Sequence, residues 1–157
     1  MIRAAMTTDA PGIAAIWNPV IRDTTITFSP VQKSEAEIAA LTTGPDPFLV
    51  WGEAGQILGF ARYFPFRSGP GYLHTVEHTI LLRPDCWGRG GGRVLMTALC
   101  NLARDHGKHS MFAGVCAEND AGRAFHIALG FVEVARLPEV GFKFGRWIDL
   151  VLMQKRL

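Results

Sequence analysis

The spacing of apolar residues along the chain alternates between helical and strand patterns, with breaks at glycine, proline and capping residues. A first helix is predicted after Thr8–Pro11, which offers a capping side chain and an early proline. Apolar residues then recur every three or four positions, at Ile13, Ile16, Trp17, Val20 and Ile21. A second helix is predicted from the capping box Ser34–Glu37 until the sequence Gly-Pro-Asp-Pro at residues 44–47 ends it.

Shorter apolar runs predict the strands. Residues 48–51 and 57–64 are two such runs joined by a Glu-Ala-Gly-Gln turn, which is typical of a hairpin. The other predicted strands are residues 1–4, 75–82, 111–116, 131–137 and 147–154, and two further helices are predicted at residues 88–106 and 121–129. The order β-α-α-β-β-β-α-β-α-β-β places a strand-helix-strand-helix-strand stretch inside an otherwise antiparallel sheet. We therefore expect a single domain over residues 1–157 of the mixed α/β (α+β) class.

Charge and composition exclude several classes of protein. The 16 Lys and Arg residues against 14 Asp and Glu residues give a net charge of +2, so the basic excess that nucleic-acid binding requires is missing. With 48% hydrophobic residues the chain is not expected to be disordered, and no apolar run approaches the roughly 20 residues that cross a bilayer. No signal peptide is visible, so we expect a soluble cytoplasmic protein. Cys86, Cys100 and Cys116 are odd in number and far apart, so neither a disulfide framework nor a metal site is expected.

Four of the 17 glycines fall within residues 88–92, between a predicted strand and a predicted helix. Glycines there let the backbone approach a bulky anion, which the free N–H groups of the first helical turn would then face. Neither the Walker loop nor the Gly-x-Gly-x-x-Gly motif fits, because Arg93 stands where each motif needs another residue. We therefore expect a pyrophosphate-binding loop assisted by nearby arginines, namely Arg83, Arg89 and Arg93. A flexible turn that merely starts a helix is the alternative.

With this loop the sequence resembles the GNAT superfamily of acetyl-CoA-dependent N-acetyltransferases. The superfamily pattern Gln/Arg-x-x-Gly-x-Gly/Ala is met by Gly90 and Gly92, whereas Trp87 stands where Gln or Arg is usual. Residues 119–131, which end in Leu-Gly-Phe, are similar to the second CoA segment of the superfamily. The resemblance implies a mainly antiparallel central sheet flanked by helices.

The resemblance also implies acetyl-CoA as the co-substrate and suggests which residues hold it. The strands around Ile80 and Cys116 would splay apart, and the pantetheine arm would pair with free backbone groups in the gap. Asn119 would cap its helix and also hydrogen-bond a pantetheine amide. The implied cofactor-binding residues are Ile80, Leu81, Leu82, Gly88, Arg89, Gly90, Gly91, Gly92, Arg93 and Asn119.

A narrower resemblance, to phosphinothricin and methionine sulfoximine acetyltransferases, rests on Thr24-Thr25 with Phe28, on residues 75–78 and on residues 139–150. It implies an amino-acid-like acceptor whose carboxylate is held by Arg67, the alternative being a solvated arginine. The side chains expected to wall the acceptor pocket are Phe28, Phe66, Tyr72 and Thr79. The resemblance further implies a homodimer, in which the segment with Lys143 and Trp147 contacts either the partner or the pocket.

Two side chains carry the expected chemistry. Glu77 matches the position of a glutamate base, which would take a proton from the acceptor ammonium; the alternative is a carboxylate paired with a neighbour. His126 stands where many superfamily members have a tyrosine acid and would protonate the leaving thiolate, unless it is a structural residue.

The expected activity is acetyl transfer to the amino group of a small amino acid or analogue, by direct attack in a ternary complex. Three alternatives remain open. The acceptor could instead be a polyamine, an aminoglycoside or a protein N-terminus, which an arginine in the pocket disfavours. Cys116 could carry the acetyl group, or the protein could bind acetyl-CoA without turnover.

Overall fold

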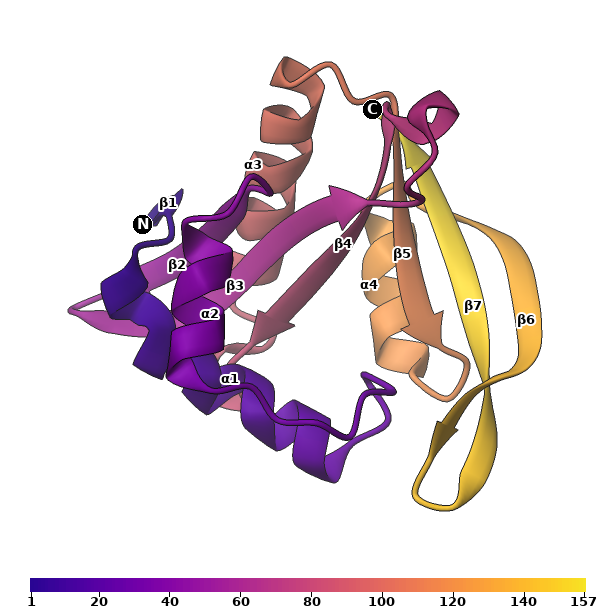
Figure 1. Ribbon diagram of the computed structural model, residues 1–157, viewed down its shortest axis with the longest axis horizontal. Helices are drawn as coiled ribbons and strands as arrows, with labels where there is room; N and C mark the ends of the chain where they lie inside the picture. The colour runs from indigo at the N-terminus through magenta and orange to yellow at the C-terminus, as the bar shows by residue number, and fades with distance from the viewer.

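The computed structural model describes residues 1–157 and contains a seven-stranded sheet in the order β1-β2-β3-β4-β5-β7-β6 (Figure 1). All neighbouring strands are antiparallel except β4 and β5, which run parallel, so the predicted mixed and mainly antiparallel sheet is confirmed. The strands are β1 (Ile2–Ala4), β2 (Phe48–Glu53), β3 (Gln56–Pro65), β4 (Thr75–Leu82), β5 (Ser110–Cys116), β6 (Val132–Lys143) and β7 (Arg146–Arg156).

Helices cover both faces of this sheet, two on each face (Figure 1). The front face in Figure 1 carries α1 (Ala10–Asp23) and α2 (Glu35–Thr42), which lie over β2 and β3. The back face carries α3 (Gly91–Asp105) and α4 (Asp120–Ala128). No helix has the length and the apolar character that spanning a membrane requires.

Each face of the sheet has its own hydrophobic core. On the front face, the Trp17 ring of α1 packs against Phe48 and Phe60 of the β2–β3 hairpin, with ring centroids 6.5 and 4.9 Å apart. On the back face, Leu95 and Leu99 of α3 are fully buried against the central strands. Trp17, Leu95 and Leu99 belong to the apolar stripes whose 3.6-residue spacing predicted helices. Burial of these stripes explains why the helices form here.

The start of α1 differs from the prediction. Asp9 does not cap the helix with its side chain. Its carboxylate instead accepts hydrogen bonds from the Arg3 guanidinium at 2.6 and 2.8 Å and from the Met6 N–H at 2.8 Å. Asp9 therefore ties the end of β1 to the start of α1.

The sixth strand is longer than predicted. It continues past Pro138 to Lys143 and forms a long hairpin with β7, whereas the sequence predicted an end at Leu137. The strand passes the proline through an irregularity between Leu137 and Gly141, with Glu139 at a φ of 53°. A proline is tolerated in an edge strand at such a bulge, because no ladder hydrogen bond is needed from it there.

Candidate functional site

The parallel strands β4 and β5 separate in the middle of the sheet. His78 and Ala113 are the last residues that pair, although β4 continues to Leu82 and β5 to Cys116. The strands therefore splay apart beyond His78, as the resemblance implied. This gap is the point at which the backbone of the sheet becomes accessible to a ligand.

The register decides which backbone groups face the gap. Hydrogen bonds at both ends of the β3–β4 ladder show that the odd-numbered residues of β4 direct their N–H and C=O groups to β3. The even-numbered residues Ile80 and Leu82 direct theirs to the gap. Leu81 pairs with Phe60 inside the sheet, so the expectation that its backbone meets a pantetheine arm is corrected.

Trp87 lies beside the outer end of this gap. Its side chain is 62% exposed, and its indole N–H donates to the carbonyl of Leu82 at 3.3 Å. One of the acceptors that faces the gap is thus already bonded to a side chain. Ile80 offers a backbone donor and acceptor that remain open, and Leu82 keeps its N–H.

The four glycines at residues 88–92 serve two different structural purposes, two of them before α3 and two in its first turn. Gly88 and Gly90 have positive φ angles of 74° and 81°, and a Cβ on either would meet no atom within 4 Å. These two glycines leave an open surface at the N-terminus of α3, where free N–H groups favour an anion. A Cβ on Gly91 would lie 2.1 Å from the Trp51 ring, and one on Gly92 would lie 3.1 Å from Leu82. The latter two glycines allow close packing of α3 on the sheet.

The arginines near the loop are engaged to different degrees. Arg83 forms an ion pair with Asp85 at 2.6 Å, and Arg89 faces Glu53 at 3.8 Å. Arg93 donates to the carbonyl of Ala128 at the end of α4 at 3.4 Å. Arg89 and Arg93 hold only long contacts, so they are the two that can turn toward a phosphate at small cost.

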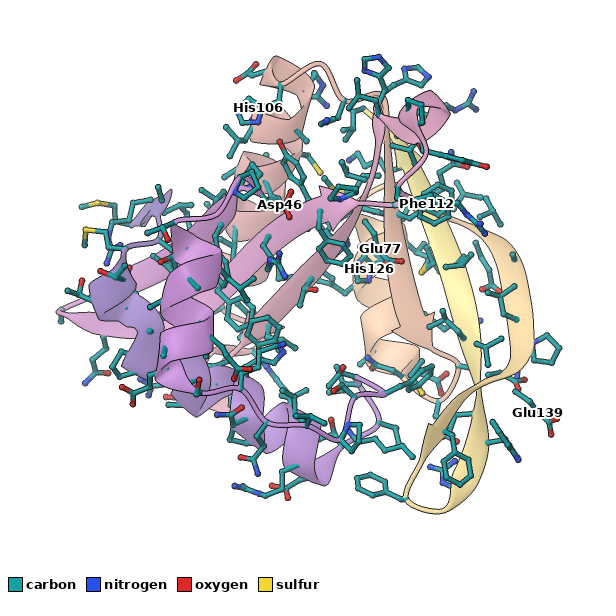
Figure 2. All side chains as sticks on the ribbon, viewed as in Figure 1. Asp46, Glu77, His106, Phe112, His126 and Glu139 are labelled. Atoms are coloured by element: carbon teal, nitrogen blue, oxygen red, sulfur yellow. The ribbon has the colours of Figure 1, made fainter.

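Glu77 lies on β4 just before the splay, next to Phe112 of β5 (Figure 2). Its carboxylate is half-buried, and burial alone raises its pKa above the usual value of 4.5, because no neighbouring cation or hydrogen-bond donor opposes the effect. Gly114 of β5 lies beside this carboxylate, since a Cβ built on it would be 3.5 Å from Oε1 of Glu77, which is an ordinary van der Waals distance. The alternative in which Glu77 is paired with a neighbour does not hold in this structure.

His126 on α4 contacts the strand residue that follows Glu77. Its Nδ1 lies 2.6 Å from the carbonyl oxygen of Gly122, and its Nε2 lies 3.1 Å from Nε2 of His78. Burial lowers the pKa of both histidines, to about 3 for His78. Both rings are therefore neutral near neutral pH, and neither nitrogen of His126 is free. Although Glu77 and His126 lie close together in the view of Figure 2, alternation along β4 places them on opposite faces of the strand.

Asn119 caps α4 as predicted, since its Oδ1 accepts the N–H of Gly122 at 2.9 Å. Its predicted hydrogen bond to a pantetheine amide stays a prediction. Because Gly122 also supplies the carbonyl that holds His126, the first turn of α4 links the cap to the histidine pair.

Aromatic rings lie above Glu77 on the front face. The Phe66 ring stacks on Phe112 with centroids 4.6 Å apart and an interplanar angle of 17°. The Arg67 guanidinium lies 5.7 Å from the Phe66 ring and 5.9 Å from the Tyr72 ring. Arg67 and Tyr72 also line a cavity of about 180 Å³, whose wall includes Tyr63 and Val76 of the back-face core but not Glu77, Phe66, Thr79 or Phe28. None of the ion pairs in the chain includes Arg67, so its guanidinium is available to a carboxylate.

Two other residues expected in the pocket lie further along the same face. Thr79 follows Glu77 on that face of β4 and pairs across the ladder with Arg62. Phe28 belongs to the segment after α1 and packs on Gly141 of β6, where a Cβ would lie only 2.4 Å from its ring. Phe28 is thereby held by the β6–β7 hairpin rather than by β4.

Sequence reasoning missed three residues that shape the site. Phe112 and Gly114 alternate along β5 and therefore share the face of Glu77, but only the parallel register reveals that they lie beside it. His78 belongs to the segment 75–78 that carries the narrower resemblance, but the sequence predicts no role for it, because its partner comes from a helix 48 residues further along the chain.

The sequence matches the family described as the acetyltransferase (GNAT) family over residues 17–131. The chain belongs to the GNAT family of acetyltransferases. Its relatives include methionine sulfoximine and phosphinothricin acetyltransferases, the same proteins to which the sequence motifs showed a resemblance.

Three relatives of this GNAT acetyltransferase are informative. It is 41% identical to the L-amino acid N-acyltransferase MnaT of Escherichia coli strain K12, over 99% of this chain and 93% of the relative. It is 40% identical to the L-methionine sulfoximine/L-methionine sulfone acetyltransferase of Pseudomonas paraeruginosa PA7, over 99% of this chain and 94% of the relative. A crystal structure of a phosphinothricin acetyltransferase from Sinorhizobium meliloti in complex with acetyl-CoA superposes with a TM-score of 0.92 at 31% identity, covering 100% of this chain and 88% of the other.

Proposed function

We propose that this GNAT enzyme transfers the acetyl group of acetyl-CoA to the α-amino group of a small amino acid or analogue of the methionine sulfoximine, methionine sulfone or phosphinothricin type. The observation that carries the proposal is the position of Glu77. An unpaired, half-buried carboxylate lies at the point where two strands of an acetyltransferase sheet splay apart. The relatives named above support the acceptor class.

The residues present fit acetyl-CoA. Gly88 and Gly90 leave the N-terminus of α3 open, so backbone N–H groups can hold the pyrophosphate together with Arg89 and Arg93. Ile80 offers unpaired backbone groups in the gap to the pantetheine arm, and Asn119 would contribute its remaining amide group. When bound there, acetyl-CoA supplies the reactive thioester.

Glu77 is the base in this proposal. An amino-acid amine is protonated near neutral pH and must lose a proton before its nitrogen can attack the thioester carbonyl. Because burial raises the pKa of Glu77, its carboxylate is a better proton acceptor than a solvated glutamate. Glu77 accepts the ammonium proton, directly or through one water, and passes it to solvent after the transfer.

His126 acts as a positioning residue rather than as the acid in this proposal. Its Nδ1 proton is donated to Gly122 and its Nε2 is bonded to His78, so no proton is directed at the gap. The nitrogen of the acceptor loses a second proton when the carbon–sulfur bond breaks. That proton balances the leaving thiolate, and the transfer needs no separate acid from the protein.

Arg67 is the carboxylate-binding residue. A guanidinium that stacks on two aromatic rings without an ionic partner can bind a carboxylate through two parallel hydrogen bonds. The same charge disfavours a polyamine or an aminoglycoside in the pocket. Phe66, Phe28 and Thr79 would bound the side chain of the acceptor.

Direct attack is favoured over an acetylated cysteine. Cys116 is only 2% exposed at the end of β5, where its backbone pairs with Leu150 of β7. Buried cysteines of this kind are usually inert, because an apolar environment disfavours the nucleophilic thiolate.

The partner in solution would be a second copy of the chain. The β6–β7 hairpin forms one edge of the sheet and exposes a set of large apolar side chains, which we call the hairpin patch: Val132, Val134, Val140, Phe142, Phe144 and Trp147. The Phe142 and Trp147 rings lie 4.8 Å apart and are 52% and 62% exposed. Exposed apolar groups gathered on an edge hairpin are typical of a protein–protein contact.

The activity is tested by following the release of free CoA thiol from acetyl-CoA with a panel of acceptors. The panel contains methionine sulfoximine, methionine sulfone, phosphinothricin, ordinary L-amino acids, spermidine and an aminoglycoside. The proposal predicts turnover with members of the first four classes and confirmation of the N-acetyl product by mass spectrometry. Turnover confined to the polycations would contradict it. Binding of acetyl-CoA by calorimetry without any turnover would favour an acetyl-CoA sensor instead.

A further inference from the structure

The β6–β7 hairpin contains a buried ammonium group that the proposed reaction does not use. Lys143 is 4% exposed, and its Nζ donates to the carbonyl oxygens of Thr24 and Thr27 at 2.6 and 2.7 Å. None of the ion pairs in the chain includes Lys143, and its Nζ lies 5.2 Å from the centroid of the Phe144 ring. A buried lysine whose charge meets only two backbone carbonyls is fixed by those carbonyls.

These two carbonyls belong to the segment that carries Phe28. Residues 24–34 connect α1 to α2 and contain no helix or strand, so contacts from elsewhere must fix their conformation. Lys143 bonds this segment at both ends of a short stretch, Thr24 and Thr27, directly before Phe28. The lysine therefore fixes the backbone position and orientation at Phe28.

A second contact joins the same two pieces of the chain. Gly141 and Lys143 are two residues apart on β6 and are both buried, so their side-chain positions share the face of the hairpin that meets this segment. A Cβ on Gly141 would lie 2.4 to 2.8 Å from three atoms of the Phe28 ring. The ring is thus seated directly on the glycine backbone.

A further ion pair lies at the turn of the hairpin, where β7 begins at Arg146. Arg146 forms a two-bond ion pair with Glu118, which follows β5. Arg146 and, as a smaller effect, the Thr25 side chain of the segment lower the pKa of the Glu118 carboxyl, so Glu118 lies next to the segment. The segment is held by the hairpin at Thr24, Thr27 and Phe28. All three contacts come from β6, through Lys143 and Gly141.

We propose that Lys143 is a positioning residue for the acceptor, because it clamps residues 24–28 to the β6–β7 hairpin and so holds Phe28 as a wall of the acceptor pocket. This inference rests on the proposed function. The inference adds to the proposed function that the contact between Lys143 and the segment limits the size of the acceptor side chain. Lys143 itself does not touch the reacting atoms. With Lys143 bonded to the segment, the position of Phe28 favours compact amino-acid-like acceptors.

The clamp is tested with Lys143→Met, which nearly keeps the length and volume of the side chain and removes the ammonium that donates both hydrogen bonds. The matched control is Lys155→Met on β7, where Nζ donates to the carbonyl of Leu129 at 2.6 Å, far along the strand from residues 24–28. The first readout is hydrogen–deuterium exchange of the peptide containing residues 24–28. The second is the pair of KM values for the best acceptor and for acetyl-CoA.

Lys143→Met is expected to raise exchange in residues 24–28 and to raise the acceptor KM about tenfold, with acetyl-CoA KM changed by less than about twofold, since a charged hydrogen bond to each carbonyl is lost. Lys155→Met should leave both readouts at the wild-type values. Turnover of bulkier amino acids relative to the best acceptor should rise in Lys143→Met only.

Gly141→Ala is a second, independent probe, because it displaces the Phe28 ring without touching the lysine. It is expected to shift the acceptor KM in the same direction, and it keeps the inference testable if Lys143→Met does not fold. Unchanged exchange and unchanged acceptor KM in an active, folded Lys143→Met or Gly141→Ala enzyme would overturn the inference. Failure of the proposed function would look different: the wild type itself would turn over no amino acid.

Discussion

The Nε2 atoms of His78 on β4 and His126 on α4 lie 3.1 Å apart, and the bond between them has a direction. Nδ1 of His126 must carry a proton because it contacts a carbonyl oxygen, that of Gly122. A neutral His126 therefore has a bare Nε2, and His78 is the donor. The chain of hydrogen bonds runs from the strand at the apex of the splay to the first turn of α4.

This pair predicts a loss of stability in mild acid. The folded-state pKa of His78 is about 3, against 6.5 for an unperturbed histidine, because burial disfavours the charged ring. Below pH 6.5 the unfolded chain takes up a proton that the folded chain does not, so stability falls as the pH drops from 6.5 toward 3. Between pH 6.5 and 5 the loss from this residue is about 2 kcal/mol. His126, whose pKa is also lowered by burial, adds to it.

Urea unfolding at pH 7.5 and pH 5.0 measures this difference. The exposed His109 provides the control, since His109→Gln should show the same pH dependence as the wild type, whereas His78→Asn should show a smaller one. Equal unfolding free energies at the two pH values in the wild type would contradict the buried neutral pair.

Substitution of Gly90 and of Gly91, at the start of α3, should affect two different properties, acetyl-CoA affinity and stability. Gly90→Val places a β-branched side chain at a φ of 81° on the surface where the pyrophosphate would approach, so acetyl-CoA affinity measured by calorimetry should fall at least about tenfold. Gly91→Ala forces a methyl group onto the Trp51 ring and should lower the free energy of unfolding by about 1–3 kcal/mol. If Gly90→Val bound acetyl-CoA as tightly as the wild type, the loop would not be the pyrophosphate site.

Arg67 predicts a selective effect on the acceptor. Arg67→Ala should raise the KM of an amino-acid acceptor by about tenfold or more with the KM of acetyl-CoA nearly unchanged, because a bidentate ionic contact to the carboxylate is lost. Arg67→Lys should recover only part of the loss, since an ammonium cannot reproduce the planar fork. The exposed Arg22 serves as the control, through Arg22→Ala. Equal increases in both KM values would refute the carboxylate contact.

The hairpin patch predicts the assembly state. Light scattering coupled to gel filtration should give the mass of a dimer for the wild type and of a monomer for the double variant Phe142→Ser, Trp147→Ser. Trp87→Ser is the matched control, because Trp87 and Trp147 are both 62% exposed and only Trp147 lies in the patch. A wild type that elutes as a monomer at assay concentrations would rule out the patch as a dimer contact.

The sequence was informative wherever a local pattern has one structural solution. The apolar spacing of α1 and α3, the capping box at Ser34 and the cap by Asn119 are all present as predicted. The extension of β6 beyond Pro138 was missed, because a proline usually ends a strand unless a bulge accommodates it.

Contacts between residues far apart in the sequence are the part of the site that could not be predicted. Glycine spacing located the loop, but only the packing of Trp51 shows that Gly91 serves the core rather than the ligand. In the same way, the register of β4 removes Leu81 from the gap, and a helix far along the chain engages His126 with His78. None of these relationships has a signature within a short stretch of sequence.

The central claim is that Glu77 removes the acceptor proton during acetyl transfer, and the pH profile of kcat/KM tests it most directly. For the wild type, activity should fall as the pH drops through a pKa above the usual glutamate value of 4.5, in line with the buried carboxylate. Glu77→Gln should lower kcat/KM by roughly 10²- to 10⁴-fold and remove the dependence due to this group, while acetyl-CoA affinity is retained. The exposed Glu35, changed to Gln, should behave as the wild type. A Glu77→Gln enzyme with the kcat/KM and the pH profile of the wild type would contradict the account.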